Sequence, residues 1–317
     1  MKIVILDGHA VNPGDLSWDC FRAFGDVTVY ERTEPAQVAE RLKNAEIVMT
    51  NKTPITSELL DACPTIQLVC VLATGYNVVD CLACRARGIP VCNVPDYGTN
   101  AVAQFTFSLL LELCNRVGLH SDAVHNGEWT NCPDFCFWKT PQMELAGKTL
   151  GIIGFGRIGR AVGRIAKAMG MDVIANNRSR HPEGETIGRY VDLDTLLKES
   201  DVISLHCPLT AENAQLINAN TISIMKDCAI LLNTARGGLL NEQDVAEALH
   251  SGKLKAAAVD VVSYEPISKN NPLLTAPNCI ITPHMAWAPI ESRQRILDCT
   301  VSSIQAFLED SPINTVN

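Results

Sequence analysis

Three polar side chains suited to proton transfer and carboxylate binding occur in the second half of the chain. They are Arg236 in LLNTARGG, Glu265 in VDVVSYEP and His284 in ITPHMAWAP. Each follows an apolar run with the character of a buried strand. Because the carboxyl ends of strands in an open parallel sheet face one crevice, we expect the three side chains to converge there.

Together these three side chains have the chemistry needed to reduce a 2-keto acid. The planar fork of Arg236 can bind the substrate carboxylate and keto oxygen. His284, as an imidazolium, can donate a proton to that oxygen as a hydride reaches the carbon, and can take it back in the reverse reaction. Glu265, bonded to the other ring nitrogen, would orient the ring and stabilise its charged form. Each residue alone also fits an ordinary loop position, so the prediction depends on their occurring together.

A glycine-rich turn offers a place for the hydride donor. Gly154, Gly156 and Gly159 stand in G-x-G-x-x-G order within GIIGFGRIGR, directly after a predicted strand and at the start of a predicted helix. In that context the glycines allow a tight turn, close approach of a pyrophosphate to backbone N–H groups, and close packing of helix and strand. The sequence therefore predicts a dinucleotide site, with an ordinary glycine turn as the alternative.

The end of the next strand bears on which dinucleotide binds. In MDVIANNRSR, the position that usually carries a ribose-binding acid is Asn177, followed by Arg178, Ser179 and Arg180. An amide does not repel a 2'-phosphate, and guanidinium groups can grip one. We therefore expect NADP, with NADPH slightly favoured over NAD, or use of both. The alternative is that these arginines belong to a solvated loop.

Two series of strands and helices position these residues. Apolar runs alternate with helical patterns over the first hundred residues, and residues 99–118 form one long apolar segment with helical character. A second alternation begins at TLGIIGF and ends at CIITPH, and a helical pattern without a following strand closes the sequence. The predicted fold class is α/β, with two Rossmann-like, doubly wound parallel-sheet domains and a cleft between them.

Composition excludes several classes of function. The 317 residues carry a net charge of -9 without a basic stripe, which argues against nucleic acid as a partner. No apolar run is long enough for a membrane span and no leader peptide is evident, so we expect a soluble cytoplasmic protein. The thirteen cysteines are expected to be free thiols, several of them in apolar strands (Cys70, Cys92, Cys207 and Cys279). Cys81 and Cys84 have metal-like spacing but sit in a helical pattern, so no metal site is predicted.

The motifs GFGRIG, HCPLT, NTARGG, VDV…EP and TPHMAWAP, in this order, resemble the D-isomer-specific 2-hydroxyacid dehydrogenase family over essentially the whole chain. HAVNPGDLSW, VLATGYNVVD and HMAWAPIESRQR are similar to its glycerate dehydrogenase (hydroxypyruvate reductase) branch. The resemblance implies a flavodoxin-like substrate (catalytic) domain of residues 1–98 and 287–317 and a dinucleotide-binding Rossmann domain of residues 99–286. It also implies a homodimer formed by the arm after residue 120.

The resemblance assigns roles to individual positions. Arg236, Glu265 and His284 match the catalytic residues. Ala73, Thr74 and Gly75 match a turn that holds the substrate carboxylate, and Lys52 either touches the substrate or is a solvated loop lysine. Trp138 and Trp287 either wall the substrate pocket or pack in the interior. The expected cofactor-binding residues are Thr99, Gly154, Gly156, Arg157, Ile158, Gly159, Asn177, Arg178, Ser179, His206, Cys207, Pro208, Thr234, Ala235, Arg236, Asp260, His284 and Ala286.

The expected function is reduction of hydroxypyruvate or glyoxylate by NAD(P)H to a D-2-hydroxy acid. Two alternatives stay open. One is a dehydrogenase for bulkier 2-keto acids, because a single sequence does not reveal the size of the pocket. The other is a cofactor-sensing binding protein similar to the corepressors that resemble this family, although the intact Arg236, Glu265 and His284 favour an enzyme.

Overall fold

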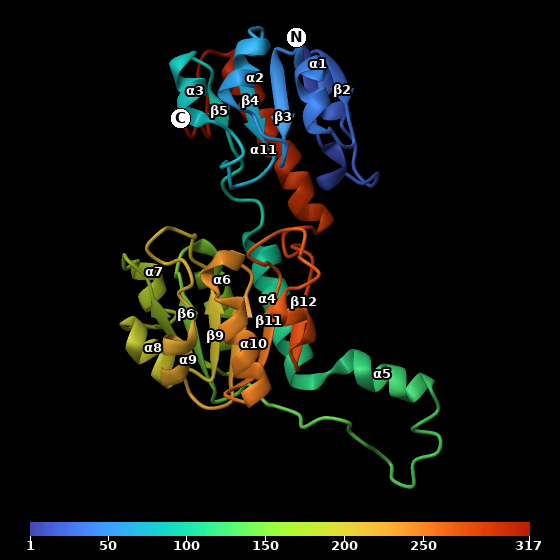
Figure 1. Cartoon of the computed structure of the whole chain (residues 1–317), viewed down its shortest axis with the longest axis vertical. Helices are drawn as coiled ribbons and strands as arrows, with labels where there is room; N and C mark the ends of the chain where they lie inside the picture. Colours follow the sequence, from blue (N-terminus) through green and yellow to red (C-terminus); the bar gives the residue numbers. More distant parts are fainter. The chain divides into compact units, whose positions relative to one another are not determined.

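The computed structural model describes residues 1–317, and close contacts divide them into two units (Figure 1). Unit 1 comprises Met1–Gly98 and Trp287–Asn317, and unit 2 comprises Thr99–Ala286. Each unit contains one sheet, and the named strands of both sheets pair in parallel. The predicted fold class of two parallel α/β domains is therefore confirmed.

The sheet of unit 1 has five strands in the order β2-β1-β3-β4-β5, which is the order of flavodoxin-like doubly wound sheets. Strands β3 and β4 are buried along their whole length, as expected for strands covered on both faces. The strands are β1 (Lys2–Ile5), β2 (Asp26–Val29), β3 (Ile47–Thr50), β4 (Leu68–Val71) and β5 (Val91–Cys92).

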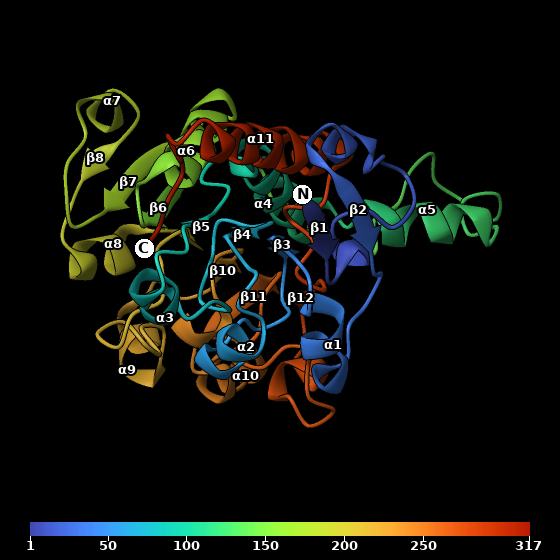
Figure 2. The same ribbon diagram turned by 90° about the horizontal axis from the view of Figure 1, so that it is seen from above.

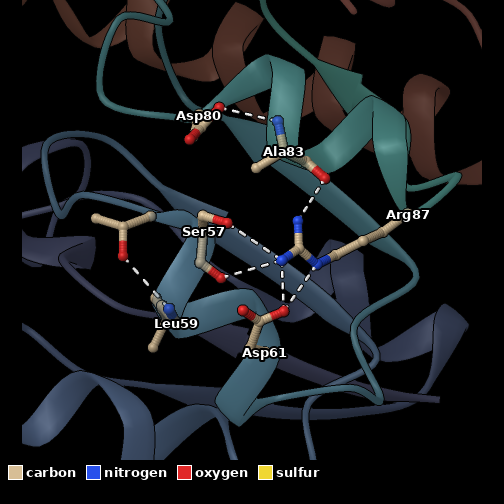
Figure 3. A network of polar contacts seen from close by, with 7 residues as sticks. Ser57, Leu59, Asp61, Asp80, Ala83 and Arg87 are labelled. Atoms are coloured by element: carbon tan, nitrogen blue, oxygen red, sulfur yellow. Dashed lines mark hydrogen bonds and ion pairs between the residues drawn. The ribbon is translucent and has the colours of Figure 1, made fainter.

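Helices cover both faces of this sheet. Helix α11 (Ile290–Leu308) packs on one face, and α1 (Val38–Leu42), α2 (Ser57–Ala62) and α3 (Cys81–Ala86) pack on the other (Figure 2). Arg87, just after α3, ties that helix to α2 because its guanidinium donates to the Asp61 carboxylate and to Ser57 (Figure 3). Short 3-10 helices complete the unit: η1 (Gly8–Ala10), η2 (Asp19–Phe24) and η3 (Pro35–Gln37).

The sheet of unit 2 has seven strands in the order β12-β11-β10-β9-β6-β7-β8. Read from the other edge, its first six strands follow the 3-2-1-4-5-6 order of dinucleotide-binding folds, with β6 first in the chain. The order reverses between β6 and β9, so the crevice for a ligand lies at their carboxyl ends. The strands are β6 (Thr149–Ile153), β7 (Asp172–Asn176), β8 (Arg189–Tyr190), β9 (Val202–Leu205), β10 (Ala229–Asn233), β11 (Leu254–Val259) and β12 (Cys279–Ile281).

Two apolar cores flank the sheet of unit 2. One contains residues of α4 and α6, and the other contains residues of α8, α9 and α10 (Figure 2). The helices are α4 (Thr99–Asn115), α5 (Val117–His125), α6 (Arg157–Ala168), α7 (Pro182–Glu185), α8 (Leu193–Glu199), α9 (Ala219–Ile224) and α10 (Glu242–Ser251), with 3-10 helices η4 (Gly237–Leu239) and η5 (Pro272–Thr275). None of the helices in the chain has the length and apolar content needed to cross a membrane.

Helix α5 and the loop after it extend away from the body of unit 2 (Figure 1). The segment predicted as one helical stretch, residues 99–118, is in fact divided. Helix α4 ends at Asn115, Arg116 has a left-handed φ of +46°, and α5 begins at Val117. A left-handed residue cannot continue an α-helix, so this part of the prediction was wrong.

Candidate active site

The glycine-rich turn joins β6 to α6, and its three glycines have different surroundings. Gly154 has a φ of +95°, and a Cβ added to it would lie 2.4 Å from the Cys207 backbone nitrogen. A Cβ on Gly159 would lie 2.2 Å from the Gly154 carbonyl oxygen, so helix and turn pack directly together. At Gly156 nothing lies within 4 Å of an added Cβ. The turn thus leaves space before the N–H groups at the start of α6, where a pyrophosphate fits.

The segment after β9 forms the other side of this turn. His206 donates its backbone N–H to the Ile153 carbonyl, and its Nε2 lies 2.8 Å from Ser204 Oγ. Burial lowers the pKa of the His206 imidazole to about 3, so the ring is neutral at physiological pH. Burial also raises the pKa of the Cys207 thiol, and the charge of Arg178 partly opposes that effect. Pro208, also expected near the cofactor, is exposed.

Asn177 connects the end of β7 to the glycine-rich turn. Its Oδ1 accepts the Phe155 backbone N–H at 3.0 Å, and its Nδ2 donates to the Ser179 carbonyl at 2.7 Å. The amide therefore holds the turn while presenting no negative charge beside it. Arg178 and Ser179 follow on an exposed loop.

A hollow of about 410 Å³ opens next to Asn177. Arg180 contributes to its wall, and its guanidinium lies 5.7 Å from the centre of the Tyr190 ring. Asp192 also lines the hollow, but its carboxylate accepts hydrogen bonds from the Thr195 N–H and hydroxyl at the start of α8. The full lining is Asn177, Arg180, Arg189, Tyr190, Val191, Asp192 and Thr195. Arg189 and Tyr190 were not predicted, because the two-residue strand β8 that carries them is too short for a periodic pattern.

Arg236 lies just beyond β10 on a turn shaped by a buried amide. Asn233, the last residue of β10, is fully buried; its Nδ2 donates to the Arg236 carbonyl and its Oδ1 accepts the Ala235 N–H. The Arg236 side chain is exposed, and its guanidinium donates to the Ala235 carbonyl at 2.7 Å. Thr234 Oγ1 lies 3.0 Å from Thr106 Oγ1. Asn233 was not predicted as a site residue, although an amide at the end of the apolar run AILLN could have indicated that it shapes the following turn.

Glu265 and His284 form a close pair, as predicted. Nδ1 of His284 lies 2.7 Å from Oε2 of Glu265, and about a third of each side chain is exposed (31% and 38%). The other carboxylate oxygen of Glu265 accepts the Val262 N–H at 3.3 Å. Arg236, Glu265 and His284 follow the neighbouring strands β10, β11 and β12, so they share one edge of the sheet.

The loop that carries His284 is anchored by Asp260. His284 has a left-handed φ of +53°, which a non-glycine residue adopts only where its surroundings enforce it. The buried Asp260 carboxylate accepts hydrogen bonds from Thr282 Oγ1 and from the N–H groups of Met285 and Ala286. The backbone carbonyl of Asp260 accepts the His284 N–H at 2.8 Å. Asp260 was predicted only to line a cofactor, and the structure gives it this positioning contact as well.

The expected substrate-binding residues belong to unit 1. Thr74 Oγ1 donates to the Val94 carbonyl at 2.7 Å, which fixes the turn that includes Ala73 and Gly75. Lys52 is exposed, and its backbone N–H donates to the Asp7 carboxylate. These contacts order both loops within unit 1.

The remaining expected positions have mixed surroundings. Thr99 and Arg157 are the first residues of α4 and α6, and Ile158 packs against an apolar core. Trp287 packs edge-on against Tyr97, at 6.2 Å between ring centres. Trp138 is 68% exposed, so interior packing within the chain is the wrong interpretation for it.

The thirteen cysteines have free thiols. Cys70 and Cys92 are buried, as expected, while Cys207 and Cys279 are only partly so. Cys81 and Cys84 lie on α3, and the structure contains no group of three or more His, Cys, Asp or Glu side chains able to hold a metal ion.

Comparison with known proteins places this geometry in a family. Residues 107–286 match the model described as "D-isomer specific 2-hydroxyacid dehydrogenase, NAD binding domain". The chain is 53% identical over 321 residues to a hydroxypyruvate reductase of Blautia hydrogenotrophica, and the match covers 100% of both chains. The chain belongs to the D-isomer specific 2-hydroxyacid dehydrogenase family. The resemblance read from the sequence motifs is confirmed.

Other relatives of this 2-hydroxyacid dehydrogenase agree with that placement. It is 39% identical to a glycerate dehydrogenase of Methylorubrum extorquens, with 99% of this chain and 98% of the relative covered. Among solved structures, an acyclic imino acid reductase in complex with NADPH and D-Arg matches with a TM-score of 0.85 and 29% identity over 100% of both chains. The chain therefore lies in the glycerate dehydrogenase and hydroxypyruvate reductase branch, and it is a nicotinamide-dependent oxidoreductase, as predicted.

Proposed function

We propose that this dehydrogenase reduces hydroxypyruvate and glyoxylate with NAD(P)H, giving D-glycerate and glycolate. The observation that carries the proposal is the 2.7 Å contact between Glu265 and His284 at the strand edge that also carries Arg236. The 53% identity to a hydroxypyruvate reductase supports the choice of substrate.

The roles of the side chains follow from their positions. The bound nicotinamide supplies the hydride, and the open space at Gly156 fits the pyrophosphate of such a cofactor. Glu265 engages Nδ1 of His284, so proton transfer to the keto oxygen falls to Nε2. The exposed guanidinium of Arg236 pairs with the substrate carboxylate and keto oxygen. The turn of residues 73–75 is proposed to hold the substrate carboxylate, as the family resemblance implies. Lys52, which follows a strand of unit 1, is proposed to add a further substrate contact.

We propose that NADPH is preferred over NADH. The amide of Asn177 leaves the ribose position without a negative charge, and the guanidinium of Arg180 borders the adjoining hollow. A 2'-phosphate carries negative charge, which an arginine attracts and an aspartate would repel. Solved relatives include complexes with NADPH and with NAD, so the proposed preference depends on Asn177 and Arg180.

The proposal includes a homodimer in the cytoplasm. Trp129, Phe135 and Trp138 are large apolar side chains exposed on the loop after α5, and a second copy of the chain would cover them. Thirteen free cysteines fit a reducing compartment, since paired cysteines predominate in oxidising ones.

A steady-state panel tests the proposed function. Hydroxypyruvate, glyoxylate, pyruvate, 2-ketoisocaproate and phenylpyruvate are each assayed with NADH and with NADPH. We expect the highest kcat/KM with hydroxypyruvate or glyoxylate and NADPH. Higher kcat/KM with the bulkier acids would favour the alternative dehydrogenase. No turnover with any acid, together with NAD(H)-dependent capture of a protein partner, would favour the binding protein.

A further inference from the structure

Glu242 occupies the first position of α10. An acidic residue is common at this position because its charge interacts favourably with the helix dipole. Its carboxylate, however, points to another part of unit 2. It accepts the Ser263 N–H at 2.7 Å, the Ser263 hydroxyl at 2.8 Å and Nδ2 of Asn271 at 2.9 Å. Capping of the helix is done by Asn241, whose side chain accepts the Asp244 N–H. The contacts of Glu242 therefore serve the loop and not the helix end.

The loop held by Glu242 carries Glu265. Ser263 and Asn271 lie on either side of Glu265 in the chain, so the Glu242 carboxylate accepts hydrogen bonds from both sides of this loop. Residue Val262, next to Ser263, donates its N–H to Glu265 itself. Movement of this stretch would carry the Glu265 carboxylate away from the His284 ring.

The turn that carries Arg236 packs against the same stretch. A Cβ added to Gly237 would lie 1.9 Å from the Val262 carbonyl carbon and 2.4 Å from the Ser263 nitrogen. The two backbones are thus in direct contact, which only a glycine at 237 permits. Glu242 follows Arg236 along the chain through η4, so it links the Arg236 turn to the Glu265 loop a second time.

We propose that Glu242 is a positioning residue that fixes the position of the Glu265 loop relative to the Arg236 turn. It touches neither substrate nor cofactor, and it acts by holding the Glu265 carboxylate against Nδ1 of His284. The inference rests on the proposed function, because its readout is the reduction of a 2-keto acid.

Variants of Glu242 test the proposal against a matched control on the same helix. Glu242→Ala removes all three acceptor contacts, and Glu242→Gln keeps part of them. Asp244 is the control: its carboxylate also accepts a backbone N–H from another element, that of Ala219 at 2.7 Å, but this element carries no site residue. Full-length variants are assayed for kcat and KM with hydroxypyruvate over a range of pH, for NADPH Kd by fluorescence, and for Tm.

The expected result separates positioning from stability. Glu242→Ala lowers kcat/KM by roughly 10- to 100-fold, as displaced catalytic groups do, and Glu242→Gln lowers it less. The loss is mainly in kcat, because the Glu265 carboxylate is displaced from the His284 ring, while the NADPH Kd changes less than twofold. Asp244→Asn lowers Tm and leaves kcat and the pH profile unchanged.

Two outcomes overturn the inference. One is a wild-type pH profile and kcat in both Glu242 variants, and the other is an equal effect of Glu242→Gln and Asp244→Asn on every readout. If Glu242→Ala does not fold, Glu242→Gln alone decides between these outcomes. Failure of the wild-type protein to reduce any 2-keto acid would instead count against the proposed function.

Discussion

The Nδ1 atom of His284 lies 2.7 Å from the Oε2 atom of Glu265, although the two residues are 19 positions apart in the chain. Two constraints produce this contact. The buried Asp260 carboxylate anchors the left-handed backbone at His284, and the contacts of Ser263 and Asn271 with Glu242 hold the Glu265 loop. Both sets of contacts lie within unit 2, so the pair is oriented by a single unit of the chain.

Two glycine substitutions in the β6–α6 turn should have different effects, one on the stability of the fold and the other on cofactor binding. Gly154→Ala places a Cβ at a φ of +95° and against Cys207, so we expect a loss of stability of more than about 1 kcal/mol. Gly156→Ala adds its Cβ to open space, so stability should stay within about 0.5 kcal/mol while the NADPH Kd rises about tenfold or more. Denaturant titration and fluorescence titration measure the two effects. A stable Gly154→Ala variant would contradict this interpretation of the turn.

Replacement of Asn177 by aspartate should change the choice of cofactor. Asn177→Asp keeps an oxygen to accept the Phe155 N–H but adds a negative charge next to the hollow lined by Arg180. We expect the ratio of kcat/KM for NADPH to that for NADH to fall about tenfold, which corresponds to a modest repulsion near a protein surface. Asn220→Asp, which adds the same charge on α9, is the control and should leave the ratio unchanged. An equal ratio in both variants would show that the 2'-phosphate does not bind near Asn177.

His206 should make the protein less stable in mild acid. Its pKa is lowered from 6.5 to about 3 by burial, so below pH 6.5 the unfolded chain takes up a proton that the folded protein does not. Stability is fully present above pH 6.5 and falls by about 1.4 kcal/mol per pH unit between pH 6.5 and about 3. Between pH 7 and pH 5 the wild type should therefore lose about 2 kcal/mol more than His206→Gln, measured by urea unfolding. Equal losses would show that the folded protein protonates this ring.

The exposed aromatic side chains after α5 should control assembly. The wild type is expected to sediment at about twice the chain mass of 34.4 kDa. Phe135→Ser combined with Trp138→Ser should raise the dimer dissociation constant at least about 100-fold, since buried aromatics dominate interface energies. Leu82→Ser, which removes a 77% exposed leucine from α3 in unit 1, should have no effect. A monomeric wild type would contradict the proposed dimer.

Much of the fold could be predicted from the sequence because buried parallel strands are short, apolar and followed by turns. The runs at β3, β6, β9 and β10 have this pattern, and each is a strand in the structure. Strand β8 has only two residues, so it offers no periodicity. The break between α4 and α5 depends on the left-handed backbone of Arg116, for which no glycine or proline gives a signal.

Site residues could be predicted from the sequence only where an unusual residue type at a strand end indicated a function. Arg236, Glu265 and His284 are conspicuous because charged or polar groups rarely close apolar strands. The loop contacts of Asp260 and Glu242 could not be predicted, since each depends on which loop the fold brings to the carboxylate. The sequence likewise gives no sign that Gly237 differs from other turn glycines, because its close contact with the Val262 backbone arises only in the folded chain.

The most direct test is the steady-state reduction of hydroxypyruvate by NADPH in wild type, Glu265→Gln and His284→Gln. We predict turnover by the wild type, a kcat at least about 100-fold lower in His284→Gln, and an intermediate kcat in Glu265→Gln. NADPH should bind all three with similar Kd. A His284→Gln variant with the kcat of the wild type would contradict proton transfer by this histidine.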